Sequence, residues 1–333
     1  MVLIISNKGD IHCNPVIKKF QSLGIPFFRL NTEELIHDYQ ITFTYSNTKP
    51  ALRLINKKNG KELISNDISA VWDRRPLSQD INFIDDDKIR DIVDSEVNEL
   101  NLWIRYYFHG TKMIGSSVLD RPNESKIRQL KIASSVIYEH SLNIKIPESI
   151  ITNNFYDFSN FIDNKDFVVI KPIGSDAYQV DDIYEIPFVS LKKDTNDIKS
   201  NVEKSDIELC PVFSQEYIEK KFELRITSVG SQHFTCKINS QNLPKGKGRE
   251  DWREGYEHGL KDHQEVFQTP TEIEDFCNIY LKLINSSFGC FDFICDKNGD
   301  YYFLECNPNG QWMWLEEDLG LPISDAIADF LIS

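Results

Sequence analysis

The fold of this chain is decided by Phe291-Asp292-Phe293-Ile294 and the later run Tyr302-Phe303-Leu304-Glu305-Cys306-Asn307-Pro308-Asn309. Two apolar segments joined by a turn at Lys297-Asn298-Gly299 predict a β-hairpin, and each strand contains one acid. This spacing can bring Asp292 and Glu305 together on one face. Two neighbouring buried carboxylates require a positive charge between them. With the amide of Asn307 they form an oxygen donor set that suits Mg²⁺, so the hairpin predicts a metal site.

Composition limits the function classes. The chain has 333 residues, of which 41% are hydrophobic and 27% charged, with a formal net charge of −15. This balance is typical of a globular protein with two or three packed units. It argues against general nucleic-acid or anionic-membrane binding, because those partners require a positive surface. Short basic clusters in so acidic a chain therefore point to local anion binding.

The amino-terminal run Met1–Ser6 is apolar but much too short for a signal-peptide core or a membrane span, so we expect a cytoplasmic protein. The seven cysteines are odd in number and contain no CxxC pair, so neither a disulfide framework nor a zinc site is indicated. Most are expected to be small buried core residues. They are Cys13, Cys210, Cys236, Cys277, Cys290, Cys295 and Cys306.

The first third predicts an α/β domain. A strand at Met1–Ser6, a helix at Cys13–Leu23 and a strand at Phe27–Leu30 form a βαβ opening typical of a parallel sheet. Alternating segments at Ile41–Tyr45 and Ala51–Ile55 predict a hairpin inserted in that sheet. Further elements are a strand at Ala70–Trp72 and a long amphipathic helix at Asp85–Phe108, whose acidic face is interpreted as solvated rather than as a docking site.

A domain boundary is expected near Asp120-Arg121-Pro122. The sequence predicts three units, 1–119, 120–210 and 211–333, in an α/β (α+β) protein. Predicted helices lie at about 123–140, 155–162 and 271–286, and predicted strands at 167–170, 212–218, 223–229, 233–238, 289–295 and 300–306. The polar region 175–206 gives only a weak hairpin pattern.

The run Leu304-Glu305-Cys306-Asn307-Pro308-Asn309 resembles the E-x-N-P-N ending of ATP-grasp enzymes, with Asp292 as the upstream metal ligand. The resemblance implies an ATP-grasp fold behind an amino-terminal pre-ATP-grasp domain. It also implies ATP and two Mg²⁺ ions as cofactors, with the metal ligands Asp292, Glu305 and Asn307.

Carried along the chain, the resemblance implies a nucleotide site. The strand Phe167–Lys171 ends in the lysine expected to reach the α-phosphate, Ser214–Ile218 resembles the adenine hinge, and Glu223 would bind the ribose hydroxyls. The expected nucleotide contacts are Lys126, Lys171, Gln215, Glu216, Tyr217, Ile218 and Glu223. Taken alone, Lys171 could be an exposed strand-end lysine and Lys126 a solvated helix lysine.

The loop Lys245-Gly246-Lys247-Gly248-Arg249-Glu250-Asp251-Trp252-Arg253 gathers four cations. Arg253 is expected to stabilise charge on the transferring phosphoryl group and Arg225 to act on phosphates or a substrate carboxylate, which makes both candidate catalytic residues. The alternative is a flexible basic loop. The expected lid, Pro172–Asp176, has fewer glycines than the family pattern, so it offers fewer backbone contacts to phosphate.

Within the superfamily the chain resembles the graspetide synthetases, which mature ribosomally made (RiPP) peptides. The motifs are Val71-Trp72-Asp73-Arg74-Arg75-Pro76, Arg121–Lys126, Phe222–Thr227 with Lys237–Gln241, and Asp251-Trp252-Arg253. The resemblance implies that Glu or Asp side chains of a precursor peptide are phosphorylated by ATP and captured by Thr or Ser as an ω-ester, or by Lys as an amide. The implied partner is a leader plus a Glu/Asp-rich core, with a homodimer also in keeping with the family.

The basic residues expected to receive an acidic core are Arg225, Lys237, Arg249 and Arg253. For Arg74 and Arg75 two interpretations stay open: peptide binding, or ion pairs with the acidic helix Asp85–Glu99. Trp72 is expected in the core. Two other functions compete with macrocyclisation: a ligase that adds an amino acid to a protein or small-molecule carboxylate, and a regulatory module that binds ATP without chemistry.

Overall fold

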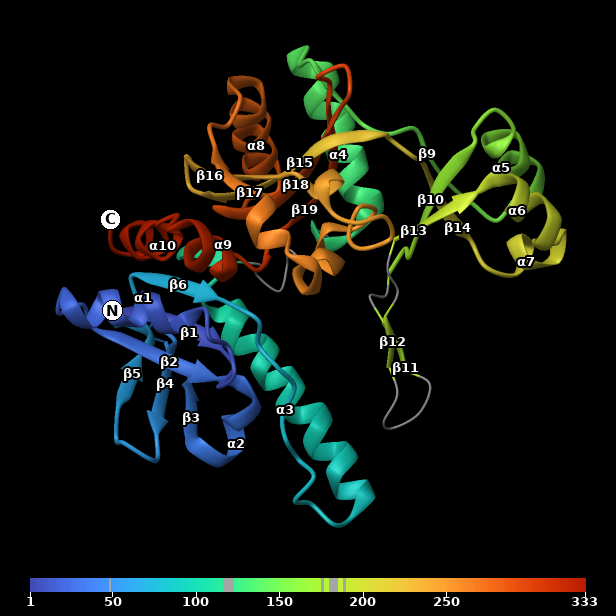
Figure 1. Cartoon of the computed structure of the whole chain (residues 1–333). Coiled ribbons are helices and arrows are strands. Elements are labelled where there is room, and N and C mark those ends of the chain that lie inside the picture. The colour runs from blue at the N-terminus through green and yellow to red at the C-terminus, as the bar shows by residue number, and fades with distance from the viewer. Residues whose placement is uncertain (48, 116–122, 175–176, 180–184, 188–189) are drawn as a thin grey trace.

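The structure is a computed structural model of the 333-residue chain, and it describes all residues except 48, 116–122, 175–176, 180–184 and 188–189. Figure 1 shows an amino-terminal domain, a central lobe set to one side, and a large carboxy-terminal sheet between them. The boundary motif Asp120-Arg121-Pro122 and part of the predicted lid lie outside the described residues.

The amino-terminal domain is built on a parallel sheet in the order β2-β1-β6-β7. Its strands are β1 (Val2–Ser6), β2 (Phe27–Asn31), β6 (Ala70–Asp73) and β7 (Lys112–Gly115), and α1 (Cys13–Ser22) connects the first two. Every residue of β1 is buried, as expected for a strand covered on both faces. The predicted βαβ opening is confirmed.

A second sheet corrects the prediction of a hairpin inserted in the first. Strands β3 (Tyr39–Thr44), β4 (Ala51–Asn56) and β5 (Glu62–Ile64) pair only with one another, in the order β3-β4-β5. Their buried side chains, including Leu52, Leu54 and Leu63, pack into the same core as Leu3 and Ile5 of β1. The strands thus cover one face of the parallel sheet rather than extending its edge, and alternation along each strand does not distinguish these arrangements.

The helix α3 (Asp87–Tyr107) confirms the predicted long helix. The side chain of Asp86 accepts hydrogen bonds from the backbone of Lys88 and Ile89 and so caps its amino terminus. Val97 and Ile104 are buried in the domain core, whereas most of the acids in its first half are exposed. The short elements η1 (Thr32–Glu34), α2 (Leu35–Asp38) and η2 (Ser65–Asp67) complete this domain.

The central lobe has an antiparallel sheet in the order β13-β10-β14-β9 with three helices on it. Its elements are β9 (Ser149–Thr152), α5 (Phe155–Ile162), β10 (Phe167–Lys171), β13 (Leu191–Asp194), α6 (Thr195–Asn201), α7 (Lys204–Leu209) and β14 (Val212–Glu216). A hairpin of β11 (Ala177–Gln179) and β12 (Glu185–Pro187) projects from it (Figure 1). The predicted hairpin is present, but α6 and α7 were not predicted, since both are short and polar.

The carboxy-terminal unit is a six-stranded sheet in the order β17-β16-β15-β18-β19-β8. Its strands are β15 (Lys220–Val229), β16 (Gln232–Ile238), β17 (Gln264–Phe267), β18 (Phe288–Asp296), β19 (Tyr301–Asn307) and β8 (Ile144–Lys145). One face packs on α4 (Lys126–His140) and α8 (Thr271–Leu283). Two strands do not follow the predicted unit boundaries. Strand β14 falls in the predicted third unit, 211–333, but pairs in the central sheet. Strand β8 falls in the predicted second unit, 120–210, but pairs in the carboxy-terminal sheet.

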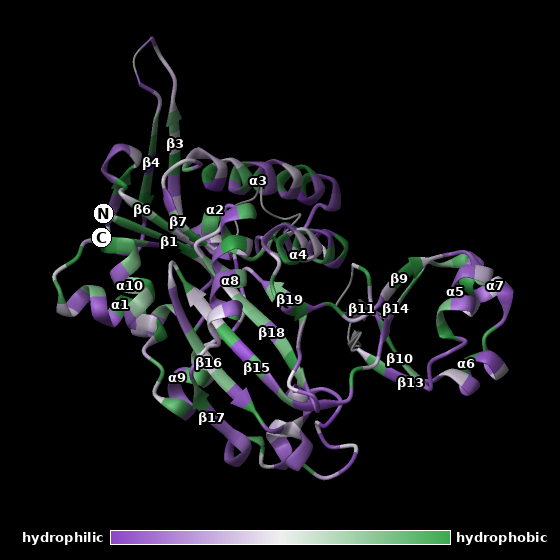
Figure 2. Ribbon diagram, turned by 90° about the horizontal axis from the view of Figure 1, so that it is seen from above, coloured by the Kyte–Doolittle hydropathy of each residue, from purple (hydrophilic) through white to green (hydrophobic). Residues whose placement is uncertain are grey.

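The other face of this sheet carries a core shared with the amino-terminal domain. Helices α9 (Met313–Leu319) and α10 (Ile323–Ile332) pack there with α1, and Figure 2 shows them beside the sheet. Trp72 and Trp312 are both fully buried in this shared core, which confirms the expectation for Trp72. Three short helical segments, η4 (Ser240–Asn242), η5 (Trp252–His258) and η6 (Leu260–His263), lie between β16 and β17.

Six of the seven cysteines are buried, Cys210 is exposed, and all are free thiols, as the sequence predicted. Among the described residues, no helix has the length and apolar character needed to cross a membrane.

Candidate nucleotide and metal site

The two acids of the hairpin lie directly opposite each other. Asp292 on β18 pairs in register with Glu305 on β19, and a β-bulge follows immediately after Asp292. Asp292 is only 6% exposed, which rules out a surface hairpin with solvated acids. The predicted meeting of the two carboxylates on one face is therefore confirmed.

Two arginines neutralise this acid pair. Arg225, on the neighbouring strand β15, is buried and donates from Nη1 to both Asp292 oxygens at 3.1 and 3.0 Å. Arg253 donates from Nη2 to Asp292 at 3.0 Å and to Glu305 at 3.1 Å, so one guanidinium group bridges the two carboxylates. Arg253 is held in turn by Asp251, whose carboxylate accepts from the Arg253 backbone at 3.0 Å.

These contacts set the charge states. Burial alone would raise the pKa of Asp292, but Arg225 and Arg253 outweigh it and hold that pKa below its usual value. Burial alone would lower the pKa of Arg225, but Asp292 outweighs it and raises that pKa. The acid stays ionised and able to act as an oxygen ligand.

The donor set fits Mg²⁺ incompletely on its own. Within the described residues, no three His, Cys, Asp or Glu side chains gather as a metal cluster. Asp292 and Glu305 supply two carboxylates, and the Asn307 Oδ1 accepts one hydrogen bond from the Asn309 backbone at 2.9 Å, which leaves a second lone pair. Such a set suits an ion that completes its shell with substrate phosphates and water, which is the habit of Mg²⁺.

A cavity beside the acid pair collects most of the predicted nucleotide residues. It is lined by Lys171, Gln215, Glu216, Tyr217, Ile218, Glu223, Arg253, Asp292 and Glu305. These residues come from the central sheet and from the carboxy-terminal sheet, so the cavity lies where the two units meet (Figure 1). Burial lowers the pKa of Lys171, with Glu305 as the largest opposing influence. Lys171 thus faces the acid pair and is not an exposed edge lysine.

The side chains of the predicted adenine hinge differ in how far they are free to contact a ligand in the cavity. Gln215 donates to the Ser149 hydroxyl at 2.9 Å and is buried, and Ile218 is also buried. The ring of Tyr217 lies against Phe167 and under the ammonium of Lys192, 3.7 Å from the ring centroid. Ile218 therefore presents an apolar side chain to the cavity, whereas one face of Tyr217 is already occupied.

The two carboxylate oxygens of Glu223 have different surroundings. One of its carboxylate oxygens pairs with Lys220 in a buried ion pair, and Lys220 also donates to the Glu250 carbonyl at 2.9 Å. The other oxygen, Oε2, is buried and has no hydrogen-bond partner among the residues that the structure describes. A buried acceptor in a cavity is the feature that a ribose hydroxyl would satisfy. Lys220, which the sequence did not single out, is the cation that makes this burial tolerable.

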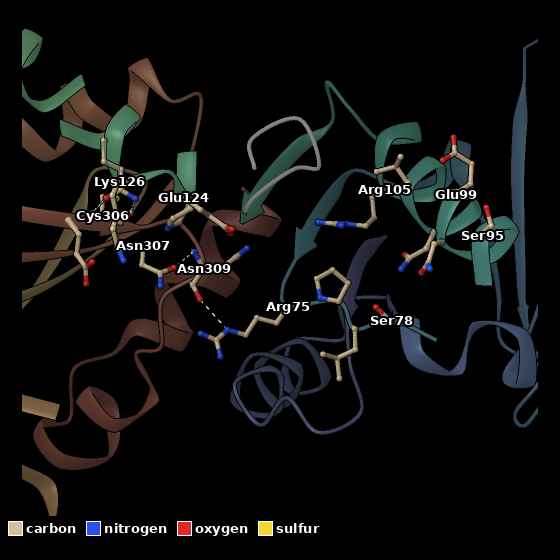
Figure 3. Close-up of a pocket in the computed structure, with 18 residues that line it drawn as sticks. Arg75, Ser78, Ser95, Glu99, Arg105, Glu124, Lys126, Cys306, Asn307 and Asn309 are labelled. Atoms are coloured by element: carbon tan, nitrogen blue, oxygen red, sulfur yellow. Dashed lines mark hydrogen bonds between the residues drawn. The ribbon is translucent and has the colours of Figure 1, made fainter. Parts of the chain in front are cut away.

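A second, larger cavity of about 760 Å³ opens on the other side of Glu305. Lys126 and Asn307 line it together with Arg75 and Arg105 from the amino-terminal domain (Figure 3). Lys126 Nζ donates to the Pro172 carbonyl at 2.9 Å, so this lysine is tied to the start of the predicted lid rather than solvated. Glu305 lines both cavities.

The basic loop splits into residues near the acids and residues away from them. Arg253 reaches the acid pair, whereas Arg249 donates to the Leu243 carbonyl. Lys237, outside the loop on β16, was also expected to receive an acidic core, and it pairs with Glu265 at 2.6 Å. Trp252 is buried and packs against Trp314. The loop is thus anchored by its tryptophan, and the description as a merely flexible basic loop does not apply to its last three residues.

The two arginines of the amino-terminal motif have different surroundings. Arg74 is 1% exposed, lies 3.3 Å from Asp10 and donates to the carbonyls of Asn309 and Gly310 at 2.6 and 3.1 Å. Arg75 donates to the Asn309 carbonyl at 3.3 Å. No ion pair joins either arginine to the acidic helix α3 among the described residues, so that interpretation is wrong. No sequence pattern singled out Asp10, because its pairing with Arg74 is created only by the fold.

The loop after β19 also packs closely on Arg225. A Cβ added to Gly310 would lie 2.4 Å from Cys290 Cβ and 3.0 Å from Arg225 Nη2, so only glycine fits there. Arg225 Nη2 donates to the Gln311 carbonyl at 3.1 Å. The loop that follows the acid pair is therefore fixed from two sides, by Arg225 below and by Arg74 across the domain contact.

Comparisons with known proteins agree with this architecture. Residues 1–109 match the family model described as the MvdD pre-ATP grasp domain. No curated protein sequence matches the chain. The chain is similar to a RiPP-associated ATP-grasp ligase from Chryseobacterium gregarium, solved with ADP and a leader and core peptide, with 27% identity, a TM-score of 0.87, and coverage of 99% of this chain and 96% of that one.

Two further solved structures are similar over nearly their whole length. The macrocyclase MdnC from Microcystis aeruginosa MRC, bound with the precursor peptide MdnA, is 25% identical with a TM-score of 0.80, covering 100% and 99% of the two chains. The macrocyclase MdnB from the same organism, at 24% identity and a TM-score of 0.76 over 99% and 98%, supports the fold alone. The predicted ATP-grasp fold and the predicted resemblance to the graspetide synthetases are both confirmed.

Proposed function

We propose that this chain is an ATP-dependent ligase that phosphorylates Glu or Asp side chains of a ribosomal precursor peptide and closes macrocycles by ester formation with Thr or Ser, or amide formation with Lys. The observation that carries the proposal is the acid pair Asp292 and Glu305, which together line the cavity of the predicted nucleotide residues, while Glu305 also lines the second, polar cavity. The full-length likeness to peptide-bound RiPP ligases supports it.

The reaction has two balanced steps. A peptide carboxylate takes the γ-phosphoryl group of ATP and ADP leaves; a hydroxyl or amine of the same peptide then attacks the acyl phosphate, loses its proton and expels phosphate. Bound Mg²⁺ would supply charge neutralisation at the phosphates. Holding both reacting groups on one bound peptide makes the second step intramolecular, which favours ring closure.

The roles proposed for the chain's own residues follow from the family resemblance and from the cavities that these residues line. Lys171 and Lys126 would bind phosphate, Gln215, Glu216, Tyr217 and Ile218 the adenine, and Glu223 the ribose hydroxyls; Asp292, Glu305 and Asn307 would be the metal ligands. Arg225 holds Asp292 in place, and Arg253, with a side chain 51% exposed, is the cation able to move onto a transferring phosphoryl group.

The proposal also covers the domain division, the cellular compartment and the oligomeric state of the chain. We propose a pre-ATP-grasp domain (1–119), a central ATP-grasp subdomain (120–210) whose sheet also takes in β14, and a carboxy-terminal subdomain with the metal site (211–333) whose sheet also takes in β8. Seven free cysteines support a reducing, cytoplasmic environment. An acidic peptide core and a homodimer are also proposed, with light scattering of the purified protein as the test of the dimer.

Intact mass tests the reaction. The purified chain is incubated with ATP, Mg²⁺ and a Thr/Glu- or Lys/Glu-rich peptide encoded beside its gene, with a reaction lacking ATP as the control. Loss of the mass of one water per ring, with ATP consumed, would support macrocyclisation. A gain in mass would instead identify a ligase that adds an amino acid, and ATP binding without any mass change would identify a regulatory module.

A further inference from the structure

The cavity between the amino-terminal domain and the carboxy-terminal sheet is distinct from the one lined by the predicted adenine and ribose residues, although Lys126, Glu305 and Asn307 line its near end. Its 760 Å³ extend from Asn307 and Glu305 at one end, past Arg75, to Ser95 and Glu99 on α3 at the other (Figure 3). Polar side chains dominate its walls, and both structural units contribute to it. A cavity that begins at Glu305 and leads towards α3 is where a second, extended and polar ligand would lie.

Its charged groups are not equally available. The cations are Arg75, Arg105 and Lys126, and the acids are Glu99, Glu124 and Glu305. Arg105 donates to Asp73 at 2.8 Å, and Lys126 to the Pro172 carbonyl. Glu99 accepts from the Trp103 indole. Arg75 uses only Nε, on the Asn309 carbonyl at 3.3 Å; its two terminal nitrogens have no hydrogen-bond partner within the described residues. Arg75 is therefore the cation that can receive a ligand.

The backbone at Arg75 is unusual. Its φ of 48° lies in the left-handed region, which costs a non-glycine residue free energy and persists where the surroundings impose it. The carbonyl of Arg75 is held by the Asn7 side chain at 2.8 Å, directly after the buried strand β6. This conformation turns the side chain towards the cavity, where Figure 3 shows it between Asn309 and Arg105.

We infer that this cavity holds the core segment of an acidic peptide, and that Arg75 binds one of its carboxylates while another is presented at Glu305 and Asn307. The inference rests on the proposed function, because it takes a peptide as the substrate. The planar guanidinium, with two free terminal nitrogens, suits bidentate binding of a carboxylate. Glu99 on α3 disfavours a second carboxylate at the far end, so the cavity accepts a peptide with a defined placement of its acids.

The test compares Arg75→Ala and Arg75→Lys with the unaltered enzyme, using a Glu-rich precursor peptide that the unaltered enzyme dehydrates. We expect Arg75→Ala to raise KM for the peptide about ten- to hundredfold while KM for ATP stays unchanged. Arg75→Lys should raise KM for the peptide by an intermediate factor, since lysine keeps the positive charge but cannot bind a carboxylate through two N–H groups at once. Arg53→Ala, which removes an exposed arginine of β4 far from the cavity, is the matched control and should change neither constant.

Peptides with single Glu→Gln changes locate the contact. With the unaltered enzyme, one of these peptides should have a higher KM than the unchanged peptide. With Arg75→Ala, that Glu→Gln change should cause no further rise in KM, as expected when the Glu and Arg75 are partners in one interaction. Unchanged peptide KM in Arg75→Ala would overturn the inference. So would equal rises in both KM values, because these would mean that Arg75 only supports the Asn307–Gly310 loop. If the unaltered enzyme dehydrates no peptide, the proposed function itself has failed, which is a different result.

Discussion

Asp292 and Glu305 are register partners on adjacent strands, and Arg253 Nη2 joins them at 3.0 and 3.1 Å. Their environments differ, however. Asp292 is buried and also bound by Arg225, whereas the Glu305 side chain is 33% exposed and lines both cavities. The same loss of charge should therefore have different consequences at the two positions.

Asp292→Asn and Glu305→Gln should both abolish ATP-dependent turnover, because each removes a negative oxygen ligand. Only Asp292→Asn should destabilise the fold strongly, by about 3 kcal/mol, since it leaves Arg225 buried without its counter-charge. Urea unfolding and ATP consumption measure the two effects separately. Wild-type turnover in either variant would refute the metal assignment.

Arg253→Ala should lower kcat more than it raises KM for ATP. Its guanidinium is half exposed and bridges the acids, so it can shift onto a phosphoryl group as charge develops there. Steady-state kinetics under saturating peptide are the measurement, and Arg249→Ala is the control from the same loop, since Arg249 contacts the Leu243 carbonyl instead. A rise in KM alone would assign Arg253 to ground-state binding.

Deprotonation of Lys171 should lower the affinity for ATP at alkaline pH. Burial lowers its pKa from the ordinary 10.5, and only the protonated ammonium attracts phosphate. ATP affinity should thus be constant at neutral pH and fall as the pH rises towards that lowered pKa. Lys171→Ala should weaken ATP binding at every pH. Lys171→Arg should remove the fall in ATP affinity at alkaline pH. Fluorescence titration with ATP measures both effects. A flat profile for the unaltered chain would count against Lys171 as a phosphate ligand.

Asp10 should contribute to acid sensitivity. Burial alone would raise its pKa, but His12 and Arg74 lower it from 3.8 to about 2. A folded-state pKa below the unfolded value stabilises the fold above that unfolded pKa. About 2 kcal/mol should therefore be present above pH 4 and be lost as the pH falls towards 2.

Asp10→Asn should lose this dependence, measured as urea unfolding at pH 6 and at pH 3. Arg74→Ala should weaken it and destabilise the chain at neutral pH, because Arg74 also holds the Asn309 and Gly310 carbonyls. If Asp10→Asn shows the same acid sensitivity as the unaltered chain, other carboxylates are responsible.

The sequence by itself determined the local elements and the chemistry of the hairpin. Apolar runs and helical spacing placed β18, β19, α3 and α5 nearly to the residue, because each pattern ends in a clear polar or turn segment. The acids inside apolar strands required a positive counter-charge, and two arginines provide it. The free, buried cysteines followed from composition.

Only the tertiary structure decided which elements meet. The packing of the separate sheet β3-β4-β5 on β1, the place of β14 in the central sheet and the pairing of Asp10 with Arg74 join residues far apart in the chain, and no local pattern encodes such partners. The same holds for the cavity that brings Arg75 to Glu305 and Asn307. The sequence left Arg74 and Arg75 equivalent; burial separates them, since Arg74 is enclosed by the domain contact and Arg75, one residue later, turns into the cavity.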